Sequence, residues 1–176
     1  MRRARYFSLF AAGITVIAAL SACGGSSTSS SGGDAIAHGS ARRGAGPATR
    51  EVCDEMVRDS VPSTVGMPLV GEPVSAVRGD TFTCRYAFDG GTLDLSVRDM
   101  HTLRQAREYF REIKRGEAVK DVLPGLAEGG FTKADGSVVA KKDAMILTVD
   151  VTALPPTRVD PSGVGIDVAA TVLGCW

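Results

Sequence analysis

The sequence is poor in the residues that most often carry catalysis and metal binding. Its 176 residues include two histidines and one tryptophan, and asparagine is absent. No Cys-x-x-Cys or His-x-x-x-His spacing occurs, which argues against a transition-metal site. The Gly-x-Ser-x-Gly motif of serine hydrolases is also missing. Asparagine and lysine have A-rich codons, so the lack of asparagine and the 15 arginines against 5 lysines indicate a GC-rich genome.

Beyond residue 50, acidic residues outnumber basic residues. Residues 51–176 hold 14 Lys and Arg against 19 Asp and Glu. Binding to nucleic acid needs a basic face that neutralises phosphates, so we expect no nucleic-acid partner. His101 is the one histidine of this part of the chain, and we interpret it as a surface residue rather than as the base of a Cys–His pair. The carboxylates of Asp94, Asp99 and Asp150 are interpreted as marking the polar faces or ends of strands.

The first 22 residues have the layout of a secretory signal peptide. A positive start is followed by an apolar run over residues 7–20 and then by small residues. The positive residues are Arg2, Arg3 and Arg5. The run is shorter than the roughly 20 apolar residues of a membrane-spanning helix. We therefore predict that residues 1–22 are a signal peptide.

The end of this segment resembles the lipobox of bacterial lipoproteins. Leu20 holds its first position, the small residues Ser21 and Ala22 follow, and Cys23 is last. In that family the cysteine receives diacylglycerol and becomes the first residue, and it can also be N-acylated. The resemblance implies lipid anchoring through Cys23 at the extracytoplasmic face of the cell membrane. Because motifs for other cofactors are missing, we expect no cofactor besides this lipid. An uncleaved anchor or a plain signal peptide is the alternative.

Two further segments follow in the sequence. Residues 23–50 are rich in Gly, Ser and Ala, and such a composition predicts a flexible tether. Its root-mean-square reach is on the order of 30 Å. Residues 51–176 contain enough apolar sequence for one globular domain.

Hydrophobic periodicity predicts helices and strands within this domain. Thr49 is a candidate cap of a short helix that Pro62 and Gly66 end. Strict alternation predicts strands over 82–88 and 93–97, joined by an Asp89-Gly90 turn. Thr102-x-x-Gln105 predicts the start of a second helix, which Gly116 ends. The apolar residues that carry these predictions are Cys53, Val57, Phe82, Cys84, Tyr86, Phe88, Leu93, Leu95, Val97, Ala106, Phe110 and Ile113.

The second half of the domain repeats this order. Turns at Asp135-Gly136 and Lys142-Asp143 flank strands, and residues 145–151 alternate. A last helix presents Ile166, Ala169, Leu173 and Trp176. Hairpin-then-helix therefore occurs twice, as a weak internal repeat. We expect the α+β class, with a single antiparallel sheet and helices packed on one face.

The cysteines of the domain favour one disulfide. Cys84 lies on the predicted apolar face of its strand, and Cys53 lies on the apolar stripe of the first helix. Disulfides persist outside the cytoplasm, so we favour Cys53–Cys84 over either pairing with Cys175. Cys175 would then be a buried thiol or a site of intermolecular bonding.

The domain also resembles small actinobacterial cell-envelope lipoproteins and kinase-linked extracellular sensor domains. The resemblance rests on Cys53, on Cys84 beside Tyr86, on the glycine-rich segment 126–136 and on Cys175-Trp176. It implies an extracytoplasmic α+β domain and no reaction. We expect a non-enzymatic module that binds an envelope protein or a small hydrophobic ligand. The alternatives are a cell-wall-directed hydrolase with paired carboxylates and a structural accessory of an envelope complex.

Overall fold

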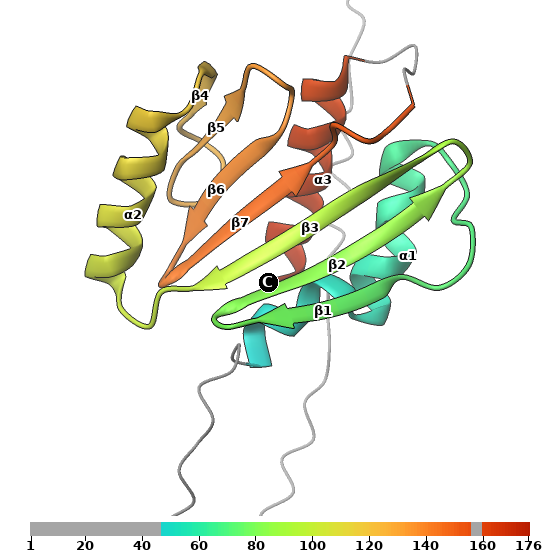
Figure 1. The fold of residues 1–176 in the computed structure, drawn as a ribbon, viewed down its shortest axis with the longest axis horizontal. Helices are drawn as coiled ribbons and strands as arrows, with labels where there is room; N and C mark the ends of the chain where they lie inside the picture. The colour runs from blue at the N-terminus through green and yellow to red at the C-terminus, as the bar shows by residue number, and fades with distance from the viewer. Residues whose placement is uncertain (1–46, 156–159) are drawn as a thin grey trace, which may run out of the picture. The chain divides into compact units, whose positions relative to one another are not determined.

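The computed structural model describes residues 47–155 and 160–176. The elements along these residues are η1 (a 3-10 helix, Pro47–Cys53), α1 (Glu55–Val65), β1 (Val74–Arg78), β2 (Thr81–Phe88), β3 (Gly91–Asp99), α2 (Leu103–Gly116), β4 (Val119–Leu123), β5 (Gly130–Lys133), β6 (Val138–Lys142), β7 (Met145–Asp150) and α3 (Pro161–Cys175). Figure 1 shows their arrangement.

The described strands form one antiparallel sheet of seven strands, in the order β1-β2-β3-β7-β6-β5-β4. The meander β1 to β3 and the meander β4 to β7 meet where β3 pairs with β7. The predicted hairpin is present, because Phe88 pairs with Gly91 across the Asp89-Gly90 turn. Gly90 has a φ of +80°, a conformation that glycine adopts without strain. The α+β class with a single antiparallel sheet is therefore confirmed.

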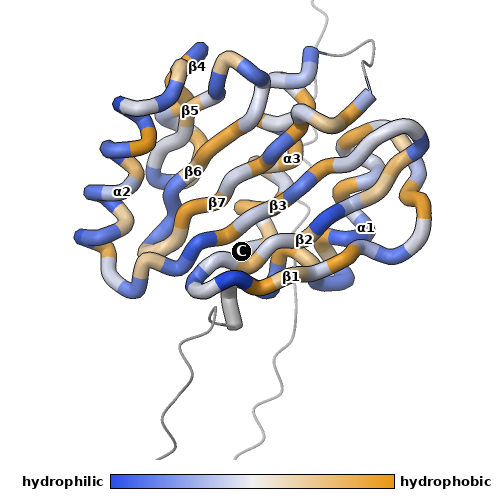
Figure 2. Tube along the Cα trace, viewed as in Figure 1, coloured by the Kyte–Doolittle hydropathy of each residue, from blue (hydrophilic) through white to orange (hydrophobic). Residues whose placement is uncertain are grey.

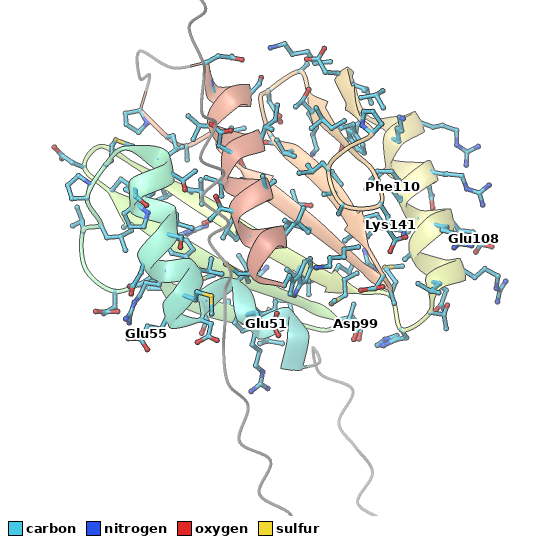
Figure 3. All side chains as sticks on the ribbon, turned by 180° about the vertical axis from the view of Figure 1, so that it is seen from behind. Glu51, Glu55, Asp99, Glu108, Phe110 and Lys141 are labelled. Carbon is cyan, nitrogen blue, oxygen red and sulfur yellow. A yellow bond between two sulfur atoms is a disulfide. The ribbon has the colours of Figure 1, made fainter. Side chains whose placement is uncertain are left out.

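The main core lies between the sheet and two helices. Alternate residues of β2 and β3 are buried, among them Tyr86, Leu93 and Leu95 at 0% exposure. They belong to one apolar cluster with α1 and α3, which also pack on each other. Figure 3 shows both helices in front of the sheet from this side. Each large apolar side chain buried here contributes roughly 1.5–3 kcal/mol to folding. We call this side of the sheet the helix side.

Helix α2 lies on the opposite face, which corrects the expectation that helices pack on one face. Its buried Ala106 clusters with Phe131, Val139 and Ile146. Val139 and Ile146 alternate with Val138 and Leu147, which belong to the core on the helix side. Both faces of β5, β6 and the first part of β7 are therefore covered. The hairpin-then-helix order does occur twice, but the two helices cover opposite faces.

The first helix also differs from its prediction. Thr49 lies in η1, and Asp54 caps α1 by accepting a hydrogen bond from the Glu55 N–H at 2.8 Å. Pro62 lies inside α1 instead of ending it, because apolar residues on both sides of the proline are buried against the core. Gly66 ends the helix in the left-handed conformation, as expected. The second predicted helix is confirmed, with the Gln105 N–H donating to the Thr102 hydroxyl at 3.2 Å.

Candidate binding surface

The uneven placement of the helices leaves part of the sheet uncovered. Helices α1 and α3 cover the helix side, whereas α2 covers the other side over β5, β6 and β7. The side of β1, β2 and β3 that faces away from α1 and α3 therefore carries none of the described helices, and it faces the viewer in Figure 1. We call this surface, with the adjoining residues of β7, the open face. Its residues are Val74, Ala76, Arg78, Thr81, Thr83, Arg85, Asp94, Ser96, Arg98, Thr148 and Asp150.

A row of hydroxyl groups crosses the middle of the open face. Thr83 pairs with Ser96, which pairs with Thr148 on the next strand. The hydroxyls of Thr83 and Ser96 are 3.0 Å apart and hydrogen-bonded. A hollow of about 420 Å³ lies over this part of β1, β2 and β3. The row thus places hydrogen-bonding groups at the floor of a shallow surface depression.

Charged residues form a second row beside the hydroxyls. Arg85 donates two hydrogen bonds to the Asp94 carboxylate, at 2.8 and 2.6 Å. The hydrogen bond to Asp94 raises the pKa of the Arg85 guanidinium, and the charge of Asp150 adds to this effect. Asp150 pairs with Asp94 across the strands. The side chain of Arg85 is 60% exposed, so its remaining donor groups stay accessible to a ligand.

Helix α2 forms a wall at one side of the open face. The guanidinium carbon of Arg98 lies 4.6 Å from the centre of the Tyr109 ring, a cation–π contact between β3 and α2. A smaller hollow of about 130 Å³ lies between these residues and β7. Ser96 lines both this hollow and the larger one. The open face is therefore a polar floor with an aromatic side chain at its wall.

The carboxylates expected at strand faces and ends do lie there. Both oxygens of Asp94 accept hydrogen bonds from Arg85. One oxygen of Asp150 accepts from the Thr152 N–H at 2.9 Å and from the Thr152 hydroxyl at 2.6 Å. Asp99 accepts from the His101 N–H at 2.7 Å. Each carboxylate thus stabilises local structure through defined donors.

His101 lies at the surface, as the sequence indicated. Its side chain is 47% exposed, and its ring nitrogens lie 3.3 Å from Asp80 and 3.6 Å from Asp99. Within residues 47–155 and 160–176, no cluster of three or more His, Cys, Asp or Glu side chains could hold a metal ion. The glycine-rich segment forms turns on either side of β5, with Gly129 and Gly136 at positive φ.

The favoured disulfide is present. Cys53 at the end of η1 is bonded to Cys84 of β2, with their Cα atoms 5.5 Å apart. Figure 3 shows the bond beside α1. Cys175, at the end of α3, lies outside this disulfide and is half-buried against the main core.

An apolar hollow lies at another place, next to the end of α3. It measures about 370 Å³, and its lining combines small and apolar residues with charged ones: Gly125, Leu126, Ala127, Glu128, Lys142, Asp143, Ala170, Leu173 and Gly174. Lys142 borders it and donates to the main-chain carbonyls of Leu173, at 3.2 Å, and of Trp176. Among the described residues, this is the place whose chemistry best fits the small hydrophobic ligand that the sequence left open.

The predicted lipidation motif, Leu20, Ser21, Ala22 and Cys23, lies outside the described residues, and so does the tether up to residue 46. In the part of the chain that the structure describes, no helix is both long enough and apolar enough to cross a membrane. Comparison with known proteins gave no match to a family model, a curated protein or a solved structure.

Sequence reasoning did not identify the open face as a site. Alternation correctly placed Thr83, Arg85 and Asp94 away from the apolar face. It did not reveal that β7 lies beside β3 or that α2 crosses to this side. The pattern of polar residues alone indicated only a wet surface.

Proposed function

We propose that this protein is a lipid-anchored extracytoplasmic binding module whose open face recognises a polar partner in the cell envelope. Two observations of different kinds support the proposal. The N-terminal 23 residues match the order of a lipoprotein signal, ending in Cys23. The open face is the observation that carries the binding role, because one side of β1, β2 and β3 carries none of the described helices, whereas both sides of β5 and β6 are covered.

The side chains of the open face favour a polar partner. Hydroxyls of Thr83 and Ser96 both donate and accept hydrogen bonds, and Arg85 offers donors beyond those that Asp94 uses. The bidentate ion pair fixes Arg85 before any ligand arrives, which lowers the entropy lost on binding. A partner rich in hydroxyl or carbonyl groups would match these donors and acceptors.

The arrangement gives less support to the cell-wall hydrolase. Two carboxylates, Asp94 and Asp150, do face the same surface as cross-strand neighbours. A glycosidase needs one of them to donate a proton and the other to attack or to activate water. Here both are engaged by neighbouring donors, and Arg85 occupies both oxygens of Asp94. Their geometry is that of a structural ion pair with a capped strand end.

The anchor is tested by metabolic labelling with radioactive palmitate. We expect label in the full chain and in the Cys175→Ser variant, and none in Cys23→Ser. Cleavage of the signal should also fail in Cys23→Ser, because the lipid-modified cysteine is what the cleavage requires in lipoproteins. Equal labelling of Cys23→Ser and Cys175→Ser would disprove the anchor.

The binding surface is tested by photo-crosslinking in the cells that produce the protein. A photoreactive residue replaces Thr83 on the open face or, as the control, the exposed Ser63 of α1 on the helix side. We expect a discrete adduct from position 83 and none of the same size from position 63. Arg85→Ala should weaken the adduct by removing the fixed donors. If both positions give the same products, the open face is not the recognition surface.

A further inference from the structure

The two edges of the sheet differ in how they are protected against pairing with another strand. An edge strand exposes unpaired N–H and C=O groups, which natural proteins protect with charges, bulges or short length. The β4 edge carries Lys120 and Asp121, and its register shifts between Val119 and Asp121. The β1 edge, Val74–Arg78, pairs with β2 in regular register, and its first four residues carry no charge. The β1 edge is therefore the one suited to accept a strand.

Exposed apolar side chains concentrate at the same edge. Six large apolar residues are exposed in the described chain, and three of them, Val70, Val74 and Val77, lie in β1 or just before it. Val74 is 66% exposed and Val77 is 51% exposed. Figure 2 shows the apolar positions along β1. Val74 lies on the open face and Val77 on the helix side, so an added strand would cover apolar surface on both sides of the sheet.

A groove runs along the helix side of β1. It has a volume of about 600 Å³ and lies between β1 and η1. Ser75, Val77 and Phe82 line it from the strands, and Cys53 lines it from η1. Arg50, Glu51 and Asp54 complete its wall, so that it carries charges of both signs. None of the described α-helices fills this space beneath the edge strand.

We propose that a second copy of this chain occupies the β1 edge, by antiparallel pairing of β1 with β1 about a two-fold axis. With Ala76 opposite the second copy's Ala76, all five strand residues pair. Val74 then faces the second copy's Arg78, and Ser75 faces its Val77. The two Arg78 side chains lie four residues apart along the pair, roughly 13 Å, so like charges are not opposed. The sequence of β1 is thus complementary to itself.

The groove supports the same occupant. In this register the second copy's Val77 lies on the helix side, opposite Ser75, where it extends the apolar lining of the groove. The two-fold axis also brings the two grooves together, and each can set Arg50 against the other's Glu51 and Asp54. Both copies keep their helices on one side of the joined sheet. Because Val52 of η1 packs in the core on the helix side, η1 of both copies lies on the same side of the joined sheet.

The proposal is tested by cysteine cross-linking of the full chain in the cells that produce it. Opposed Cβ atoms in an antiparallel pair are about 4.5–5.5 Å apart, so Ala76→Cys should yield at least about tenfold more reducible dimer than Val122→Cys on the β4 edge. The register predicts that Val74→Cys does not link to itself but links to Arg78→Cys when the two are co-expressed. The unsubstituted chain provides the background from the cysteines already present.

A second pair of variants distinguishes β1–β1 pairing from cross-links that form by random collision. Val74→Lys, added to Ala76→Cys, places a charge on the exposed edge and should abolish the dimer, whereas Val122→Lys in the same background should leave it unchanged. The proposal is wrong if Ala76→Cys gives no more dimer than Val122→Cys, or if Val74→Cys links to itself equally well. It is also wrong if Ala76→Cys links to a different protein, because the edge would then accept a foreign strand.

Discussion

The hydroxyl of Tyr86 offers the most direct test of how η1 is held to the sheet. Tyr86 is fully buried, and its hydroxyl donates to the main-chain carbonyl of Val52 at 2.6 Å. Tyr86→Phe keeps the ring packing but leaves this buried carbonyl without that donor. The cost of an unsatisfied buried acceptor is about 1–3 kcal/mol. With a urea dependence of about 2 kcal/mol per molar, a loss of about 2 kcal/mol lowers the unfolding midpoint by about 1 M.

The assay is urea unfolding of a soluble form that begins at Gly24, followed by circular dichroism. Tyr109→Phe is the matched control, because its ring contacts Arg98 at the surface of α2. A surface change of this kind should cost less than about 0.5 kcal/mol. If Tyr86→Phe is no more destabilising than Tyr109→Phe, the contact with Val52 does not contribute to stability.

The burial of Tyr86 also determines how the stability of the fold responds to alkaline pH. Burial raises the pKa of the Tyr86 hydroxyl above its ordinary value near 10. The unfolded chain therefore loses this proton at lower pH than the folded chain does. The contribution to stability is complete below about pH 10 and falls as the pH rises toward the higher, folded pKa. Tyr86→Phe should remove this part of the loss of stability at alkaline pH. Urea unfolding of the unsubstituted chain and of Tyr86→Phe at several pH values measures the difference.

Three further changes test other parts of the fold. The Cys53–Cys84 disulfide joins residues 31 apart, so its reduction should lower the free energy of unfolding by about 4 kcal/mol in the chain-entropy model. Urea unfolding with and without reductant measures this as a lower midpoint. Glu128→Gln should cost about 2 kcal/mol, because it leaves Lys141, which is 7% exposed, without its ion-pair partner. This is less than the roughly 3–5 kcal/mol of a fully buried pair, because the Glu128 side chain is 41% exposed. The Lys141 hydrogen bond also lowers the pKa of Glu128. The stability that this pair contributes is therefore present above about pH 4.5 and is lost as the pH falls through the lowered pKa. The Glu128→Gln variant should not show this acid-dependent loss of stability. Gly91→Ala should prevent the accumulation of folded protein, since its Cβ would lie 2.3 Å from the Ala153 carbonyl oxygen.

The central strands were predicted well because the signals that form a hairpin lie within its strands and its turn. Alternation over 82–88 and 93–97 with a Gly90 turn determines a hairpin wherever the strands are placed. The Thr102 cap likewise determines the start of α2 from its own neighbours. The strands β1 and β4 were not predicted. Every residue of β1 is exposed, and β4 is exposed along most of its length, so neither shows the buried alternation that identifies a strand.

Placement of the helices is where sequence reasoning failed, and the reason is visible in β6. Val138, Val139 and Ala140 are consecutive and all buried, because α3 covers one face and α2 the other. A continuous apolar run indicates burial on both faces but does not say which helix lies on which face. The open face follows from that placement, so its position could not be derived from the polar residues that form it.

The attachment of η1 relates the proposed anchor to the proposed surface. Val52 is buried in the core on the helix side, and it is held there by the Tyr86 hydroxyl and by the neighbouring Cys53–Cys84 disulfide. The chain therefore enters the domain at Pro47 from the side of the sheet opposite the open face. A lipid anchor preceding Pro47 would join this helix side and leave the open face free for a partner. The disulfide, besides stabilising the fold, thus holds η1 on the side of the sheet opposite the open face.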